Sequence, residues 1–420
     1  MRTKISGFYK KSPEERLVII AKQLNLSKEE QEIIRGQDGF SVDVADHMVE
    51  NVIGSFPIPL GIAVNFKVNE KEVFVPMATE EPSVIAAASN AAKQSAKGFF
   101  TSYTGSIMRG QIQLTNVLDP YGALARIYEN KEVILEKCNA EDPTLVSLGG
   151  GAKDLDVHVI EGATEKMVVT HLLVDTKDAM GANAVNTMAE AVAPFIEKIT
   201  GGNAVLRILS NLADQRIVRA RGVFENPFLG DKDAEEKFIR AYELAEVDPY
   251  RAATHNKGIM NGITAVVLAT GNDTRAVEAG AHAYAAITGR YRSLTHWEVG
   301  AHDSMIGSIE LPMPVGLIGG ATTSHPVAKV AMKILGVETA EELAGIIASV
   351  GLAQNFAGLK ALAGKGIQEG HMKLHARNIA RMVGAKDDDL DKVVKLAAKQ
   401  GKISYDTIKQ IVLSLEVDND

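Results

Sequence analysis

The alternation of apolar and polar residues predicts helices and one hairpin in the first hundred residues. Capping boxes at Ser12–Glu15 and Ser27–Glu30 each mark a helix start, because a hydroxyl and a carboxylate there satisfy free backbone N–H groups. Apolar and polar residues then alternate on both sides of a turn within 62–75, as in a β-hairpin. Pro82 suits the first turn of the alanine-rich helix that follows, and Gly98 is expected to end that helix.

Residues 106–210 show a different order of patterns. Strands are predicted at 111–117, 155–160, 167–173 and 204–209, and helices at 119–138 and 178–200. This βαββαβ order is ferredoxin-like, and a unit of about 105 residues can bury a core of its own. Since the chain on both sides looks helical, we predict an inserted domain.

The second half returns to helices with a few strands. The apolar run 263–270 is typical of a buried strand, and 274–288 of a helix. Further helices are expected at 340–350, 353–364 and 371–383, followed by two short helices separated by Gly401 in the tail from residue 385. The pattern favours a tail docked on the rest of the protein, but a mobile lid is the alternative.

These segments predict an α+β protein. We expect a mainly helical large domain formed by 1–105 and 211–366, interrupted by the inserted domain at 106–210. A small helical unit at 367–420 completes the chain. The length of 420 residues agrees with two or three domains.

Composition narrows the class of protein. Lys and Arg number 45 against 53 Asp and Glu, and the net charge of −8 argues against nonspecific binding to nucleic acid or anionic membranes. The lone cysteine, Cys138, excludes an internal disulfide framework and fits a reducing compartment. We find no membrane-spanning run and no signal-peptide pattern, so a cytoplasmic protein is expected.

Common cofactor and metal motifs do not match. The triplet Gly149-Gly150-Gly151 lacks the third glycine of a Rossmann fingerprint, and Gly358…Gly364-Lys365 has the wrong spacing for a phosphate loop. His371 and His375 have the spacing of a zinc site, but no third ligand is identified. We therefore predict no metal.

Two adjacent carboxylates, Glu80 and Glu81, stand beside a helix start. Their repulsion, together with burial, could keep one of them protonated as an acid. Alternatively, both simply favour the positive end of the helix dipole.

A lysine and an aspartate flank the predicted strand 263–270. Lys257 is expected in a glycine-bracketed loop, where its ammonium could stabilise an oxyanion, although a solvated loop lysine is the commoner case. Asp273 suits a helix N-cap, and a pair with Lys257 could tune the ionisation of both.

The segment Asp178-Ala179-Met180-Gly181-Ala182-Asn183 is expected to begin the long helix of the inserted domain. Free N–H groups and a glycine at a helix start suit a pyrophosphate. An aspartate N-cap with a tightly packed glycine is the structural alternative.

Together these motifs resemble one family over nearly the whole chain. The series is Glu50-Asn51-Val52-Ile53-Gly54, Pro76 to Ser83, Asp178 to Asn183, His255 to Gly262, Gly271-Asn272-Asp273 and Gly370-His371-Met372. It is similar to 3-hydroxy-3-methylglutaryl-coenzyme A (HMG-CoA) reductase of the soluble class II type. The resemblance implies conversion of HMG-CoA to mevalonate and CoA by two hydride transfers from NAD(P)H, through mevaldyl-CoA and mevaldehyde.

The resemblance also implies roles for four catalytic residues. Glu81, which directly precedes Pro82-Ser83, would donate and accept protons near the carbonyl, and Lys257 would stabilise the oxyanion. Asp273 would hydrogen-bond with both. His371 would protonate the departing CoA thiolate, with the C-terminal unit folding over the site as a flap.

Other residues are implied in binding. Ser83, Arg251, Asn261 and Gln354 match positions that hold the substrate, and Asp178, Met180, Gly181 and Asn183 match the dinucleotide loop. Asp142 falls near the expected adenosine ribose. An acid there accepts from a 2′-hydroxyl and repels a 2′-phosphate, so we expect NADH to be favoured over NADPH, although Lys137 or Lys153 could reverse this preference.

The family further implies a homodimer with the active site at the interface, often assembled into hexamers. It leaves open whether the physiological direction is biosynthetic or catabolic. Two other interpretations remain at this point: a lysine Schiff-base lyase using Lys257, and a non-catalytic CoA- or nucleotide-binding protein of the same fold.

Overall fold

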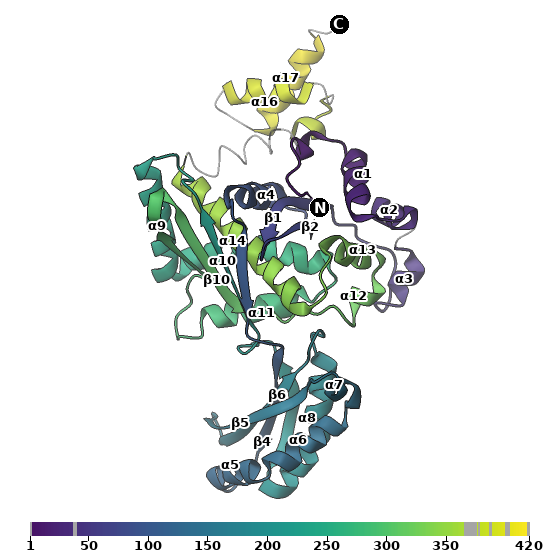
Figure 1. Cartoon of the computed structure of the whole chain (residues 1–420), viewed down its shortest axis with the longest axis vertical. Helices are drawn as coiled ribbons and strands as arrows, with labels where there is room; N and C mark the ends of the chain where they lie inside the picture. The colour runs from purple at the N-terminus through teal and green to yellow at the C-terminus, as the bar shows by residue number, and fades with distance from the viewer. Residues whose placement is uncertain are drawn as a thin grey trace.

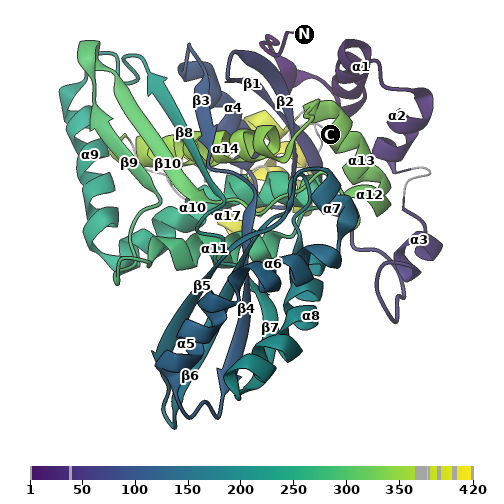
Figure 2. The same ribbon diagram turned by 60° about the horizontal axis from the view of Figure 1, so that its bottom comes forward.

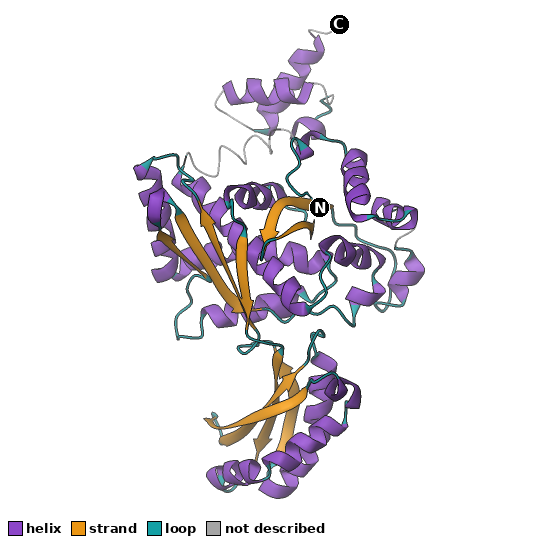
Figure 3. Ribbon diagram, in the orientation of Figure 1, coloured by secondary structure: helices purple, strands orange, loops and turns teal. Residues whose placement is uncertain are grey.

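The computed structural model describes residues 2–36, 40–364, 376, 379–385, 389–399 and 404–417. In these residues the hydrophobic side chains gather into separate clusters, belonging to a large domain, an inserted small domain and a C-terminal helical unit (Figure 1). The colouring by secondary structure shows mixed helix and sheet in the first two, as expected for an α+β protein (Figure 3).

The first part of the large domain contains the predicted helices and hairpin. Its elements are η1 (Phe8–Lys10), α1 (Pro13–Leu24), α2 (Lys28–Arg35), α3 (Val42–Asp46), β1 (Leu60–Val68), β2 (Lys71–Ala78), α4 (Val84–Gln94) and β3 (Phe99–Tyr103). Both capping boxes are confirmed, since Ser12 and Ser27 accept from, and their N–H groups donate to, the glutamates three residues on. Pro82 precedes α4 instead of lying in its first turn, and α4 ends before Gly98.

The second part completes a six-stranded sheet of order β2-β1-β3-β8-β10-β9. Its elements are β8 (Ile217–Phe224), α9 (Lys232–Val247), α10 (Pro249–Ala269), α11 (Thr274–Ala285), β9 (Thr295–Val299), η2 (Ala301–Asp303), β10 (Met305–Pro312), α12 (Ala321–Ser324), α13 (Pro326–Leu335) and α14 (Ala340–Ala363). Helix α14 packs against β3, β8 and β10 and against α4, α9 and α10 (Figure 2). The core of the domain therefore lies around this one helix.

Two predictions about this part of the chain are wrong. The run 263–270 is the second half of α10, not a strand, because a helix buried on most sides loses the polar positions that reveal its period. Segments 340–350 and 353–364 form the single helix α14. That helix is long and apolar enough to cross a membrane, but 67% of its apolar window is buried in the protein, as in a core helix.

The small domain has the expected ferredoxin-like arrangement. Its elements are β4 (Ile107–Thr115), α5 (Pro120–Glu129), α6 (Lys131–Ala140), α7 (Pro143–Ser147), β5 (Gly151–Glu161), β6 (Lys166–Asp175), α8 (Ala182–Thr200) and β7 (Asn203–Ser210). The sheet order is β5-β6-β4-β7 with antiparallel neighbours, and α5, α6 and α8 cover one face (Figure 1). The helix predicted at 119–138 is two helices that meet at Asn130.

The C-terminal unit contains the two predicted short helices, α16 (Leu390–Lys399) and α17 (Tyr405–Val417). They share a small apolar core with Ala376, Ile379 and Ala380. Gly401, His371 and most of the helix predicted at 371–383 lie outside the described residues.

Candidate active site

Glu81 lies on the short connection between β2 and α4. Its backbone N–H donates to Thr79 Oγ1 (3.2 Å), which shapes the turn. Two residues on, Ser83 has a left-handed backbone (φ 75°) and begins α4 without a hydrogen bond from its hydroxyl to the helix. A non-glycine residue in this conformation is strained, and such strain is often found at functional sites. The Ser83 hydroxyl is thus left free for a ligand.

Lys257 and Asn261 both bond to the Glu81 carboxylate. Lys257 Nζ lies 2.7 Å from Glu81 Oε2, and Asn261 Nδ2 donates to Glu81 Oε1 at 3.1 Å. Both residues are on α10, one turn apart, and therefore share a helix face. The sequence predicted Lys257 in a loop, but the helix fixes its Cα, while its side chain stays 61% exposed. The exposed Glu80 bonds to no described residue, so the contacts single out Glu81.

Two more expected substrate residues lie on or against α10. Arg251 is in its first turn, roughly 9 Å before Lys257 along the axis, and its side chain bonds to no described residue. Burial lowers the pKa of this guanidinium because it disfavours the charged form. A carboxylate partner would stabilise that charged form. Gln354 packs at Gly262, and its Oε1 is buried without a hydrogen-bond partner among the described residues. An unbonded buried oxygen suits a ligand donor or a water.

Asp273 does not meet Glu81 or Lys257 within one chain. Its Oδ1 caps α11, accepting from the backbone N–H groups of Arg275 (2.9 Å) and Ala276 (3.1 Å). Partial burial raises the pKa of Asp273, but these hydrogen bonds and the Arg275 side chain outweigh burial, so the net pKa is lowered. The turn before α11 is fixed to the end of α10 by a bond from Asn272 N to Val267 O. Val267 is ten residues beyond Lys257, or roughly 15 Å along the helix.

Instead, Asp273 lies next to the expected dinucleotide loop. Asn272 Oδ1 accepts from Gly316 N (2.8 Å). Gly316 in turn packs closely on Met180 of this loop, since a Cβ added to Gly316 would lie 2.6 Å from Met180 N. Leu317 N donates to Asp178 O, and the Asp178 carboxylate accepts from Ala340 N at the start of α14 (2.7 Å). Asp178 is therefore bonded to the large domain and does not cap α8.

The start of α8 fits an anion. Gly181 is its N-cap at φ 95°, and a Cβ there would meet Thr176 Cγ2 at 2.2 Å, so only glycine is accommodated. Among the described residues no side chain caps α8, which leaves the first N–H groups of a 19-residue helix available to a phosphate. Asn183 is in the first turn. We therefore find that the loop suits the diphosphate of a dinucleotide.

Asp142 caps a separate helix near the glycine triplet. Its Oδ1 accepts from Leu145 N (2.9 Å) at the start of α7. Lys153 Nζ donates to Gly150 O, and Lys177 Nζ pairs with Asp175 near Gly149. Lys137 lies over the Phe195 ring instead. Within the described residues no group of His, Cys, Asp and Glu is arranged to hold a metal.

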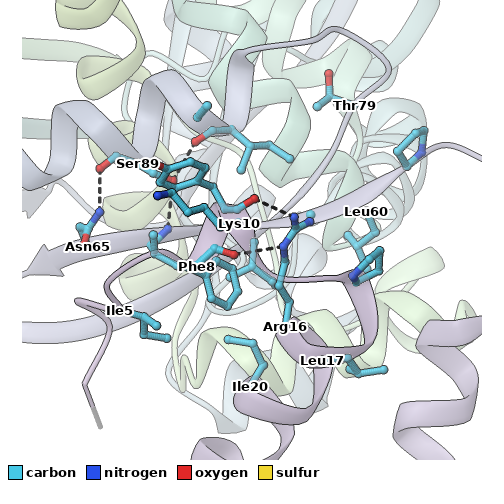
Figure 4. Close-up of a pocket in the computed structure, with 18 of the residues that line it drawn as sticks. Ile5, Phe8, Lys10, Arg16, Leu17, Ile20, Leu60, Asn65, Thr79 and Ser89 are labelled. Atoms are coloured by element: carbon cyan, nitrogen blue, oxygen red, sulfur yellow. Dashed lines mark hydrogen bonds between the residues drawn. The ribbon is translucent and has the colours of Figure 1, made fainter. Parts of the chain in front are cut away.

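A cavity of about 1340 Å³ adjoins Glu81 and Ser83. It is bounded by the N-terminal segment, α1, β1 and α4, and Figure 4 shows Arg16 holding the N-terminal segment through Phe8 O and Tyr9 O. Lys4, Lys10 and Lys93 also line it, and none forms an ion pair with a described residue. Sequence reasoning missed these cations, because nothing in a local pattern shows that residues 4–10 and α4 line the same cavity.

Comparison with known proteins gives one consistent family. The family model described as hydroxymethylglutaryl-coenzyme A reductase matches residues 12–376. A 3-hydroxy-3-methylglutaryl-coenzyme A reductase of Archaeoglobus fulgidus is 55% identical over 98% of this chain and 94% of that protein. A probable reductase of the same name from Borreliella burgdorferi is 35% identical over 90% and 89%.

Solved structures agree with these matches. A 3-hydroxy-3-methylglutaryl-coenzyme A reductase from Streptococcus pneumoniae has a TM-score of 0.83 at 42% identity, covering 98% of this chain and 99% of that chain. A class II structure from the same organism, bound to NADPH in open conformations, has a TM-score of 0.82 at 43% identity over 86% and 99%.

Proposed function

Because the chain belongs to the HMG-CoA reductase family, we propose that Glu81, Lys257 and Asn261 surround the reacting carbonyl of HMG-CoA. The enzyme is an NAD(P)H-dependent oxidoreductase of the class II type. The observation that carries the proposal is the carboxylate of Glu81 bonded to both an ammonium and an amide. This cluster offers a proton donor, a fixed cation and an orienting group at one point.

The chain's residues divide the chemistry among them. Two molecules of NAD(P)H, bound one after the other, would each supply one hydride, so that HMG-CoA, two NAD(P)H and two protons yield mevalonate, CoA and two NAD(P)+. Lys257 stabilises the oxyanion after each reduction. Glu81, whose Oε2 lies 2.7 Å from Lys257 Nζ, supplies a proton to oxygen when its carboxyl group is protonated and accepts one as the carboxylate. His371 protonates the CoA thiolate as it leaves the hemithioacetal, a role that suits its near-neutral pKa in water.

The cavity beside Glu81 is proposed to hold the CoA part of the substrate. Lys4, Lys10 and Lys93 provide cations for its phosphates without disturbing an existing ion pair. Ser83, Arg251 and Gln354 are assigned to the acyl group and its carboxylate. A Lys10→Ala, Lys93→Ala double variant is expected to raise the KM for HMG-CoA about tenfold and leave the KM for NAD(P)H unchanged. An equal rise in the two KM values would indicate that CoA binds outside this cavity.

The loop before α8 is proposed to hold the dinucleotide. Met180, Gly181 and Asn183 would contact it, while Asp178 fixes the loop to α14. We keep NADH as the preferred cofactor because the carboxylate of Asp142, near the glycine triplet, would repel the 2′-phosphate of NADPH. The Streptococcus pneumoniae relative was nevertheless solved with NADPH. Initial rates at equal concentrations of the two cofactors test this preference. A clear preference for NADPH would contradict the role given to Asp142.

A homodimer with a shared active site is supported by the position of Asp273. It lies beyond the far end of α10 from Lys257, so a second copy must supply it if it acts beside Glu81. Exposed apolar side chains at Ile53 (101%) and Phe56 (91%) offer a surface for such a copy. Light scattering tests for the dimer and for the proposed hexamer, and a monomeric active enzyme would exclude both.

We place the enzyme in the cytoplasm, in either a biosynthetic or a catabolic mevalonate pathway. The reductase activity itself is tested by loss of NAD(P)H absorbance on addition of HMG-CoA. No loss with either cofactor would contradict it. Trapping of substrate on Lys257 by borohydride would favour a Schiff-base lyase.

A further inference from the structure

Arg216 carries a positive charge that forms no ion pair within the described part of the chain. Its side chain is completely buried (0% exposed) and is the largest such side chain among the described residues. No carboxylate of a described residue forms an ion pair with it. Burying an unpaired charge is unfavourable, so a guanidinium in this position requires a specific compensation.

The guanidinium donates mainly to the loop before α8. Nη1 donates to Thr176 Oγ1 (2.9 Å), to Ala179 O (3.0 Å) and to Met180 O (3.3 Å). Nη2 donates to Val315 O (2.6 Å), in the segment that passes over the same loop. These neutral acceptors satisfy the donors but do not cancel the charge.

The bonds to Arg216 fix the direction in which the C=O and N–H groups of this loop point. In a trans peptide, C=O and N–H point opposite ways. Since the carbonyl of Met180 points at Arg216, the N–H group of Gly181 points away from it, whereas Met180 N lies against Gly316. Carbonyl oxygens that would repel a phosphate are thereby kept inside, next to a helix start that attracts one.

We propose that Arg216 is a positioning residue for the diphosphate of the dinucleotide. It orients the loop Thr176–Met180 through the carbonyls, and its buried positive charge is balanced when the diphosphate binds on the opposite side of that loop. This inference rests on the cofactor site proposed above. It assigns a role to a residue outside the motif itself.

A purely structural role is the alternative, because Arg216 also joins the two crossings between domains. Its Nε donates to Tyr103 Oη (2.7 Å). Tyr103 ends β3 just before the inserted domain, and Arg216 precedes β8 just after it. Tyr103→Phe removes this bond and leaves the bonds to the loop, which makes it the matched control.

The test measures binding, not turnover. The Kd for NADPH is determined from its fluorescence, and the Kd for HMG-CoA by calorimetry, in wild type, Arg216→Met, Arg216→Lys and Tyr103→Phe. We expect Arg216→Met to weaken NADPH at least about tenfold and to flatten the salt dependence of its Kd, with HMG-CoA unaffected. Arg216→Lys keeps the positive charge but loses the several N–H donors of the planar guanidinium, so its Kd for NADPH should lie between those of Arg216→Met and wild type. Tyr103→Phe should bind both ligands like wild type.

Two results would overturn the proposal. In the first, Arg216→Lys and Arg216→Met bind NADPH as tightly as wild type does. In the second, the Arg216 variants bind NADPH and HMG-CoA more weakly by the same factor. If Arg216→Met does not fold, Arg216→Lys decides by the same criteria. Gly181→Ala separates this inference from the proposed function. If Gly181→Ala leaves the Kd for NADPH unchanged, the proposed cofactor site is wrong; if it weakens NADPH and the Arg216 variants do not, only the role of Arg216 fails.

Discussion

Two groups of residues on this chain are each bonded together, but they lie apart from one another. The proposed acyl half-site, Glu81, Lys257 and Asn261, is already bonded together between α10 and the β2–α4 connection. The proposed cofactor half-site, Asp273 with the loop 178–183, is also assembled, through Asn272, Gly316 and Asp178. The two are at different levels of the same helix, roughly 15 Å apart along its axis. Each is complete as a unit, and one chain alone does not join them.

Helix α10 therefore acts as a spacer. It is rigid because most of its side chains are buried, and its start is fixed by Asp248 and Pro249. A two-fold axis can place the acyl half-site of one copy against the cofactor half-site of another, since the same surfaces are then used twice. A substitution of Lys257 or of Asp273 changes one half-site at a time.

The largest effect is expected for Lys257→Ala. Loss of the fixed cation should lower kcat about 10³-fold, since a preorganised oxyanion donor contributes on that order. Because the Lys257 side chain is 61% exposed, the circular dichroism spectrum and the melting temperature should stay close to wild type. Turnover within tenfold of wild type would remove Lys257 from the mechanism.

Asp273→Asn should lower kcat about 10²-fold. The amide oxygen can still cap α11, so the helix is retained while the carboxylate charge is lost. Asp273→Ser is a second capping variant and should lose activity similarly. Full activity in both would limit Asp273 to its capping role.

A smaller effect concerns His255, which lies on α10 one turn after Arg251 and two residues before Lys257 and belongs to neither half-site. It is buried, its Nε2 is within 2.8–3.1 Å of Ser293, Thr295 and Asn355, and burial together with Arg251 lowers its pKa to about 3. The unfolded chain, with a histidine pKa near 6.5, takes up this proton first as the pH falls. The stabilisation is complete above pH 6.5 and is lost progressively toward pH 3, by about 2 kcal/mol between pH 7 and pH 5.

Urea unfolding at pH 7 and pH 5 tests this expectation in wild type and His255→Gln. The variant should lose less stability between the two pH values than wild type does. An identical loss in both would show that another group is responsible.

The sequence predicted the small domain better than the helices that hold the acyl half-site. The βαββαβ order is visible in part because β4 alternates buried and partly exposed residues along its length. Helices α10 and α14 are buried on most sides, so their apolar runs carry no period, and the sequence pattern predicts a loop and a strand where α10 lies. The Glu81–Lys257 contact joins residues 176 positions apart, and no local pattern encodes it.

The role expected for Asp273 shows a second limit. Its N-cap position followed from local chemistry and is confirmed. Its bonds to Glu81 and Lys257, implied by the family resemblance, stay a prediction, because they require a second copy. The same holds for His371, which lies outside the described residues.

Subunit mixing tests the shared site most directly. Lys257→Ala and Asp273→Asn chains, each nearly inactive alone, are unfolded or dissociated together and reassembled in equal amounts. Half of the dimers are then mixed, and each mixed dimer has one site in which both residues are intact, so about a quarter of wild-type activity should return. If the mixed sample is no more active than the two variants separately, the two half-sites do not combine across an interface.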